Sequence, residues 1–136
     1  MSNPYSADMA RGDPADDAAN ATRTAVQLVE KLSEALENLR HSTRFVEKAA
    51  RRSIKLLEDG ADATTAMAAA VPAEARTVLN EALRQVEAAR HEIRLHAFAV
   101  SLDQGTSVAE LARQYGFSRQ LAARYARDAQ ESRRRR

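Results

Sequence analysis

The chain has 136 residues, of which 44% are hydrophobic and only 4% aromatic, and it has no tryptophan. This composition excludes a thick, multilayered core and favours helices that pack closely on small residues. The absence of cysteine excludes a disulfide framework, a thiol nucleophile and a thiolate metal site. No apolar run approaches the length of a membrane span and no signal-peptide pattern opens the sequence, so we expect a cytoplasmic protein without a membrane segment.

The net charge of +2 is unevenly distributed along the chain. Residues 1–20 carry one basic and four acidic side chains, whereas residues 105–136 carry eight basic and three acidic side chains. A cationic C-terminal part favours a polyanionic partner for that end of the protein.

The N-terminal part of the chain changes character within its first twenty residues. Residues 1–19 mix Pro, Gly, Asp and Ala without apolar periodicity and are predicted to be a flexible acidic arm. A long helix is predicted from about residue 16 to residue 59, with Gly60 at its end. Its apolar stripe follows a seven-residue repeat typical of coiled coils and bundles, with one row formed by Ala25, Leu32, Leu39, Val46 and Ser53.

Two further helices are predicted before the C-terminal part. Asp62 is suited to cap a short helix over residues 63–70, and Pro72 suits the first turn of a longer helix over residues 73–103. We expect the two long helices to fold into an antiparallel hairpin whose leftover apolar faces make a homodimer. The second long helix repeats Leu79, Val86, Ile93 and Val100, beside a row of small residues formed by Ala75, Ala82 and Ala89.

The stretch from Ser107 to Asp128 contains the signals of two short helices joined by a tight turn. Ser107 is followed three residues later by Glu110, which is the spacing of a capping box. Gly116 permits a left-handed turn, Phe117 is expected to be buried beside it, and Ser118 is a second N-cap. The sequence predicts helices over residues 108–114 and 118–129.

The segment "VAELARQYGFSRQLAARYAR" resembles the helix-turn-helix of bacterial DNA-binding proteins, in the three-helix form found in resolvase tails and small repressors. The resemblance covers about residues 90–129 and rests on Ala112 at the helix crossing, Gly116 in the turn and "SRQ" at the start of the second helix. Ala122 departs from the pattern, because a larger β-branched residue is commoner there. Nothing resembles the resolvase catalytic domain, so recombinase activity is not implied. Winged-helix and MerR-type heads need a β-hairpin that the few remaining residues cannot supply, and a zinc finger needs cysteine.

The resemblance implies that the helix over residues 118–129 enters the major groove of double-stranded DNA. Arginine can bond guanine through two donors, and glutamine can pair with adenine. On this basis the base-reading residues are Arg119, Gln120 and Arg124. The basic tail 130–136 would add non-specific attraction to phosphates. The residues assigned to phosphate contacts are Thr106, Ser107, Arg113, Ser118, Arg127, Arg133 and Arg134.

Two weaker patterns have plainer explanations. The basic stripe of the first long helix could be a second surface for nucleic acid or an acidic partner, but we favour a solvated helix face. Glu92 and His96 lie one turn apart with His91 nearby, yet without a third convergent ligand they are interpreted as surface residues and not as a metal site. No catalytic constellation and no cofactor motif stands out, so no enzymatic activity is expected. The basic stripe of the first long helix comprises Arg40, Arg44, Lys48, Arg51 and Lys55.

The predicted fold class is all-α, a long coiled-coil-like helical hairpin followed by a C-terminal helix-turn-helix. The predicted domains are the arm 1–19, a long-helix dimerisation region 20–89, a DNA-binding head 90–129 and the tail 130–136. The predicted function is that of a sequence-specific, dimeric transcriptional regulator. The alternatives are a helical scaffold with a degenerate helix-turn-helix, and a DNA-binding protein of the nucleoid, of plasmid partition or of phage packaging.

Overall fold

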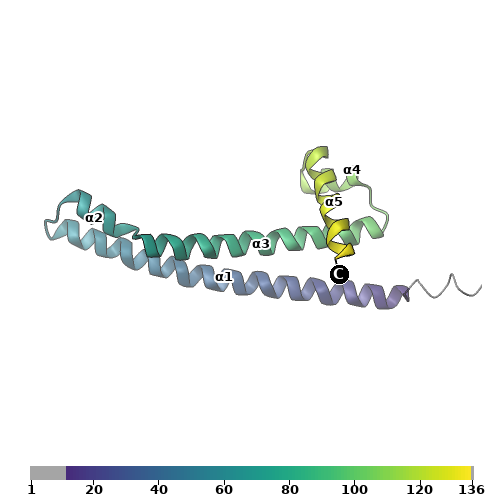
Figure 1. The fold of residues 1–136 in the computed structure, drawn as a ribbon, viewed down its shortest axis with the longest axis horizontal. Helices are drawn as coiled ribbons and strands as arrows, with labels where there is room; N and C mark the ends of the chain where they lie inside the picture. Colours follow the sequence, from purple (N-terminus) through teal and green to yellow (C-terminus); the bar gives the residue numbers. More distant parts are fainter. Residues whose placement is uncertain (1–11, 136) are drawn as a thin grey trace, which may run out of the picture. The chain divides into compact units, whose positions relative to one another are not determined.

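The computed structural model describes residues 12–135, which form five α-helices and no strand, so the predicted all-α class is confirmed. The chain divides into two compact units, which are described separately. One contains residues 29–94; the other contains the start of the chain up to Leu28 together with Leu95 onward. The helices, in chain order (Figure 1), are α1 (Pro14–Glu58), α2 (Ala63–Ala70), α3 (Ala73–Asp103), α4 (Val108–Tyr115) and α5 (Arg119–Arg134).

The first helix begins earlier than the sequence analysis expected. Helix α1 begins at Pro14, two residues before the predicted start at about residue 16, and so includes residues 14–19 of the predicted arm; residues 1–11 lie outside the described part of the chain. The reason is a complete helix start: Asp13 Oδ1 accepts a hydrogen bond from the amide of Ala15 at 3.0 Å, and Pro14 occupies the first helical position. Asp16 and Asp17 then lie in the first turn, where negative charge stabilises the helix dipole.

In the unit formed by residues 29–94, α1 and α3 pair along the seven-residue repeat. Asn38 Nδ2 donates to Gln85 Oε1 at 3.0 Å, and Lys31 Nζ lies 3.6 Å from Glu92 Oε2. A step of seven residues forward on α1 is therefore a step of seven backward on α3, so these two segments run antiparallel (Figure 1). The buried residues of the seam are mostly small, which permits a close approach of the two backbones. They are Ala35, Ser42, Ala49 and Ser53 on α1, and Ala75, Ala82, Val86 and Ala89 on α3.

The buried serines and the short helix complete this unit. Ser42 Oγ donates to the carbonyl oxygen of Asn38 at 3.0 Å, and Ser53 Oγ donates to the carbonyl oxygen of Ala66 on α2. Helix α2 begins at Asp62, whose carboxylate accepts from the amides of Thr64 and Thr65 and from the Thr65 hydroxyl at 2.5 Å. These hydrogen bonds, that from the Thr65 hydroxyl above all, lower the pKa of Asp62 below its ordinary value.

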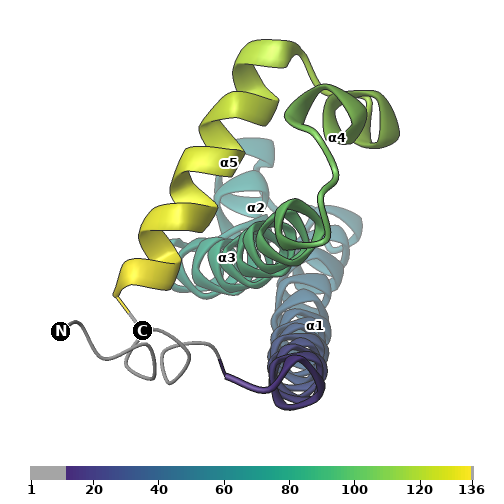
Figure 2. The same ribbon diagram turned by 90° about the vertical axis from the view of Figure 1, so that its right-hand side faces the viewer.

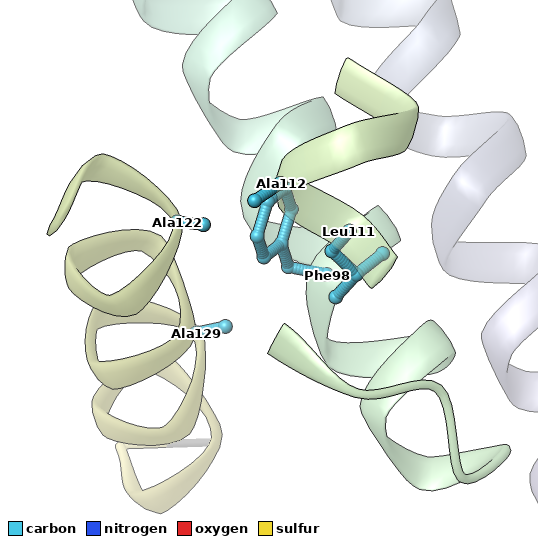
Figure 3. Packing of buried hydrophobic residues seen from close by; sticks show 5 residues of the cluster. All are labelled: Phe98, Leu111, Ala112, Ala122 and Ala129. Atoms are coloured by element: carbon cyan, nitrogen blue, oxygen red, sulfur yellow. The ribbon is translucent and has the colours of Figure 1, made fainter. Parts of the chain in front are cut away.

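The other unit is built around the last turns of α3. Its core, drawn in Figure 3, consists of Phe98 from α3, Leu111 and Ala112 from α4, and Ala122 and Ala129 from α5. In this unit α5 runs across the end of α3 and not alongside it (Figure 2). The first turns of α1 belong here too, since His96 Nε2 lies 3.0 Å from the carbonyl oxygen of Ala21.

Candidate nucleic-acid interface

A capped helix and a left-handed turn set the direction of α4. Ser107 Oγ accepts a hydrogen bond from the amide of Glu110 at 3.1 Å, as the capping spacing predicted. At the other end Gly116 has φ 68° and ψ 30°, and the amide of Phe117 donates to the carbonyl oxygen of Ala112 at 2.9 Å. This pairing of a left-handed residue with a six-to-one hydrogen bond ends a helix and reverses the chain.

A new helix begins directly after that turn. Ser118 is extended at φ −64° and ψ 157°, and its Oγ accepts from the amide of Leu121 at 3.2 Å. The two hydroxyl caps and the glycine therefore keep α4 and α5 as two separate helices. A merged, straight α4–α5 rod, which would have removed any projecting helix, is not what the chain forms.

Four aromatic rings hold the two helices against α3. Phe98 lies with its ring centroid 5.2 Å from that of Tyr115 and 5.3 Å from that of Tyr125. Phe117 stacks on Tyr125 with centroids 5.4 Å apart. Phe117 itself is half-buried and not buried as expected, because it lies at the turn on the rim of the core. Such ring contacts each add about 0.5–1.5 kcal/mol beyond area burial, so the orientation of α5 is well determined within this unit.

Helix α5 has an inner apolar face and an outer polar face. Ala122, Ala126 and Ala129 are buried and, at helical spacing, define the inner face. Gln120, Arg124 and Arg127 follow one another at three- and four-residue steps on the opposite side and are exposed. Arg119 lies in the first turn and is also exposed. All three predicted base-reading side chains are thus uncovered on one helix.

The residues assigned to phosphate contacts are spread from the start of α4 to the end of α5. Ser107 and Ser118 each accept one hydrogen bond from a helix amide, and each hydroxyl hydrogen can still be donated to an anion. Arg113, Arg127 and Arg134 are exposed, and Thr106 is half-buried. Hydroxyl donors thus lie at the two helix starts, and arginines lie at the end of α4 and along α5.

The tail needs a correction. Residues 130–134, expected as a separate basic tail, continue α5, and Arg133 forms an ion pair with Asp103 at the end of α3. Helical geometry explains this, because Arg133 lies near the angular position of Ala122 and Ala129 and so points inward. Arg133 is therefore engaged in holding α5 to α3, while Arg134 remains exposed.

The charge of α4 and α5 is positive but not uniformly so. The two helices carry six arginines against three acids, Glu110, Asp128 and Glu131. Only Glu131 lies on the outer face of α5, in the same row as Gln120, Arg124 and Arg127. It falls in the last turns, so the first half of that face carries cations and an amide.

The other candidate residues from the sequence analysis have ordinary structural surroundings. Glu92 is the partner of Lys31, His96 contacts a backbone carbonyl, and no group of three metal-ligating side chains gathers among residues 12–135. The basic stripe of α1 is exposed throughout. None of the described helices combines the length and apolar character needed to cross a membrane.

The sequence analysis missed Phe98, Ala126 and Ala129, all of which belong to the buried part of this unit. A signal for Phe98 was present, since it lies off the seven-residue rows that pair α3 with α1. No protein-family model, no curated protein and no solved structure matches this chain.

Proposed function

We propose that the protein is a non-enzymatic, sequence-specific DNA-binding protein, in which a helical hairpin is followed by a helix-turn-helix that inserts α5 into the major groove. The observation that carries the proposal is the outer face of α5. The first turns of α5 present Arg119, Gln120 and Arg124 to solvent, and Gln120 and Arg124 lie opposite the three buried alanines that anchor the helix. A helix of this kind fits the major groove, whose base edges carry a distinguishing pattern of donors and acceptors.

Each side chain has a role that follows from its chemistry. Arg119 and Arg124 would donate two hydrogen bonds each to guanine, and Gln120 would pair with adenine. The Ser107 and Ser118 hydroxyls, with the first free amides of α4 and α5, would hold phosphate oxygens at two helix N-termini. Arg113, Arg127 and Arg134 would add phosphate attraction that weakens with salt.

A homodimer would present two such heads to half-sites about one helical turn, or a multiple of it, apart. Transcriptional regulation at the bacterial nucleoid is the consequence we favour. Nucleoid organisation, plasmid partition or phage DNA packaging would use the same contacts with a different biological outcome.

A helical scaffold is the second candidate, and one observation favours it. Large apolar side chains such as Val29, Leu36 and Phe45 are exposed on the long helices, where they could bind a protein partner. In that case α4 and α5 would serve as a docking module and DNA affinity would be low at physiological salt.

The decisive experiment is selection of bound duplexes from a random library, followed by fluorescence anisotropy on the selected site across a salt series. DNA binding predicts an enriched motif and an affinity that falls with salt by a logarithmic slope of about −0.9 for each phosphate neutralised. Replacing Arg119, Gln120 and Arg124 together by Ala should abolish the preference for the selected site over random duplex, because each bidentate base contact supplies about 1–3 kcal/mol of discrimination.

The matched control is the triple variant Gln27→Ala, Arg52→Ala and Arg76→Ala, which removes the same side-chain types and the same charge from exposed positions of α1 and α3. It should keep the preference. Equal preference in both triple variants would refute the assignment of α5 as the reading helix, and the absence of salt-dependent binding would favour the scaffold.

A further inference from the structure

One flank of α1, outside the seam with α3, carries exposed apolar side chains at seven-residue spacing. Within the unit of residues 29–94, Val29 is 53% exposed, Leu36 is 39% exposed and Leu57 is 44% exposed. Ile54, on the neighbouring row, is also exposed. Leu83 of α3 is exposed as well, and the register of the hairpin sets it level with residue 40 of α1. The flank row is defined as Val29, Leu36, Thr43, Ala50 and Leu57.

The apolar residues of the flank row are placed symmetrically on either side of Thr43, the centre of the row. Leu36 and Ala50 lie seven residues before and after Thr43, and Val29 and Leu57 lie fourteen before and after it. The charges beside the row invert across the same centre. Arg40 precedes Thr43 by three residues, whereas Glu47 follows it by four, and both are exposed. Neither is ion-paired with another side chain in the described part of the chain.

We propose that α1 packs against α1 of a second copy of this chain, antiparallel, along the flank row and with the two-fold axis at Thr43. This deepens the homodimer of the proposed function, on which it rests, by naming the face and the direction. The axis sets Leu36 opposite Ala50 of the partner and Val29 opposite Leu57 of the partner. It also sets Arg40 opposite Glu47 of the partner, twice by symmetry, which is the self-complementarity that a two-fold interface requires.

Charge decides between the two directions. In the antiparallel dimer the two-fold axis is perpendicular to the helices, so Arg40 of one copy and Glu47 of the other lie on the same side of the interface and attract each other. In a parallel dimer the axis runs along the helices and puts Arg40 and Glu47 of the two copies on opposite sides, so neither attraction forms.

The opposite flank of the hairpin is a poorer interface. Its α1 positions include Lys31 and Asn38, whose polar groups already bond to Glu92 and Gln85 of the same chain. Docking a second copy there would bury these polar pairs, whereas the flank row offers apolar area whose burial is favourable.

Single cysteines test the direction, because the natural chain has none. In the full-length protein, Thr43→Cys should form a disulfide-linked dimer under mild oxidation. Leu36→Cys alone should not, since residues fourteen positions apart along a helix are separated by about 21 Å. A mixture of Leu36→Cys and Ala50→Cys proteins should cross-link to each other. Lys48→Cys, on another face of α1, is the matched control and should stay monomeric on a denaturing gel.

A parallel dimer would instead cross-link Leu36→Cys to itself, and a dimer through another face would leave Thr43→Cys unlinked; either result overturns the proposal. Charge exchange provides an independent measurement. Arg40→Glu and Glu47→Arg should each weaken the dimer about tenfold by sedimentation equilibrium, and the double variant should recover most of the loss. Failure of the double variant to recover also overturns it. None of these assays contains DNA, so their outcome is independent of whether α5 binds a duplex.

Discussion

The core around Phe98 yields a sharp prediction, because so few large side chains support it. Phe98 and Leu111 are the two largest fully buried side chains in the described part of the chain. A buried Phe→Ala substitution costs about 3–5 kcal/mol through lost transfer free energy and the cavity that remains. The part of this unit from Leu95 onward, about 40 residues, corresponds to roughly 2–6 kcal/mol of stability at typical values per residue. We therefore expect Phe98→Ala to unfold α4 and α5, at least in large part, and Phe98→Leu to cause a smaller loss.

The chain provides its own spectroscopic probe for this change. It has three tyrosines and no tryptophan, and two of the tyrosines, Tyr115 and Tyr125, lie against Phe98. The near-ultraviolet circular dichroism of tyrosine therefore reports mainly on this core, whereas the far-ultraviolet signal is dominated by the long helices. Phe98→Ala should lose most of the tyrosine signal while it retains most of the helical signal from α1 and α3.

The matched control is Phe45→Ala, the same chemical change at a half-exposed position in the other unit. It should leave the tyrosine signal unchanged. If Phe98→Ala keeps both its near-ultraviolet spectrum and its melting temperature, the core of α3, α4 and α5 described above is wrong, and the orientation of α5 loses its physical basis.

Three further predictions concern local structure. Gly116→Ala should destabilise α4 and α5 by about 1–2 kcal/mol in chemical denaturation, through left-handed strain alone, since no atom lies within 4 Å of the added Cβ; a loss below 0.3 kcal/mol would show that the turn is not left-handed. Ser118→Ala should cost about 1 kcal/mol through loss of the α5 cap, and Ser118→Asp should restore it. The lowered pKa of Asp62 means that its stabilisation of α2 is fully present above the pKa of the unfolded chain and is lost as the pH falls through the folded value. As the pH falls, amide exchange at Thr64 and Thr65 should therefore slow less than the intrinsic exchange rate does, because the protection is lost, and Asp62→Asn should remove that pH dependence.

The seven-residue rows were predictable because a repeat needs no tertiary information. Ala75, Ala82 and Ala89 are buried as a small-residue row, and Leu79 and Ile93 are half-buried beside them. The caps at Asp62, Ser107 and Ser118 were predictable for a similar reason. A side chain that bonds an amide two or three residues away is specified by local sequence.

The ends of helices and the second face of α3 were harder to predict. The start of α1 was missed because the residues of the N-terminal arm were interpreted from their composition. Asp13 is in fact an N-cap, and Pro14 follows it in the first helical turn. Helix α5 continues to Arg134 through a run of arginines because Arg133 is neutralised by Asp103, thirty residues earlier, which no local pattern specifies. Phe98 lies outside the repeat of α3. Its role in the core depends on packing with Leu111 and Ala122, which lie farther along the chain, so no local pattern predicts it.

The distribution of exposed side chains separates the roles of the two kinds of surface. Almost all large apolar side chains that are exposed within residues 12–135 belong to the long helices and α2 or to the link after it, and Tyr115 is the exception on α4. A module that docks onto proteins would be expected to expose aromatic or aliphatic anchors on α5, since interface cores are depleted in charge. Helix α5 instead exposes arginine and glutamine, the side chains suited to base edges and phosphates. The polar face of α5 supports DNA as the partner of the C-terminal helices, and the apolar flank of α1 supports a second copy of the chain as the partner of the long ones.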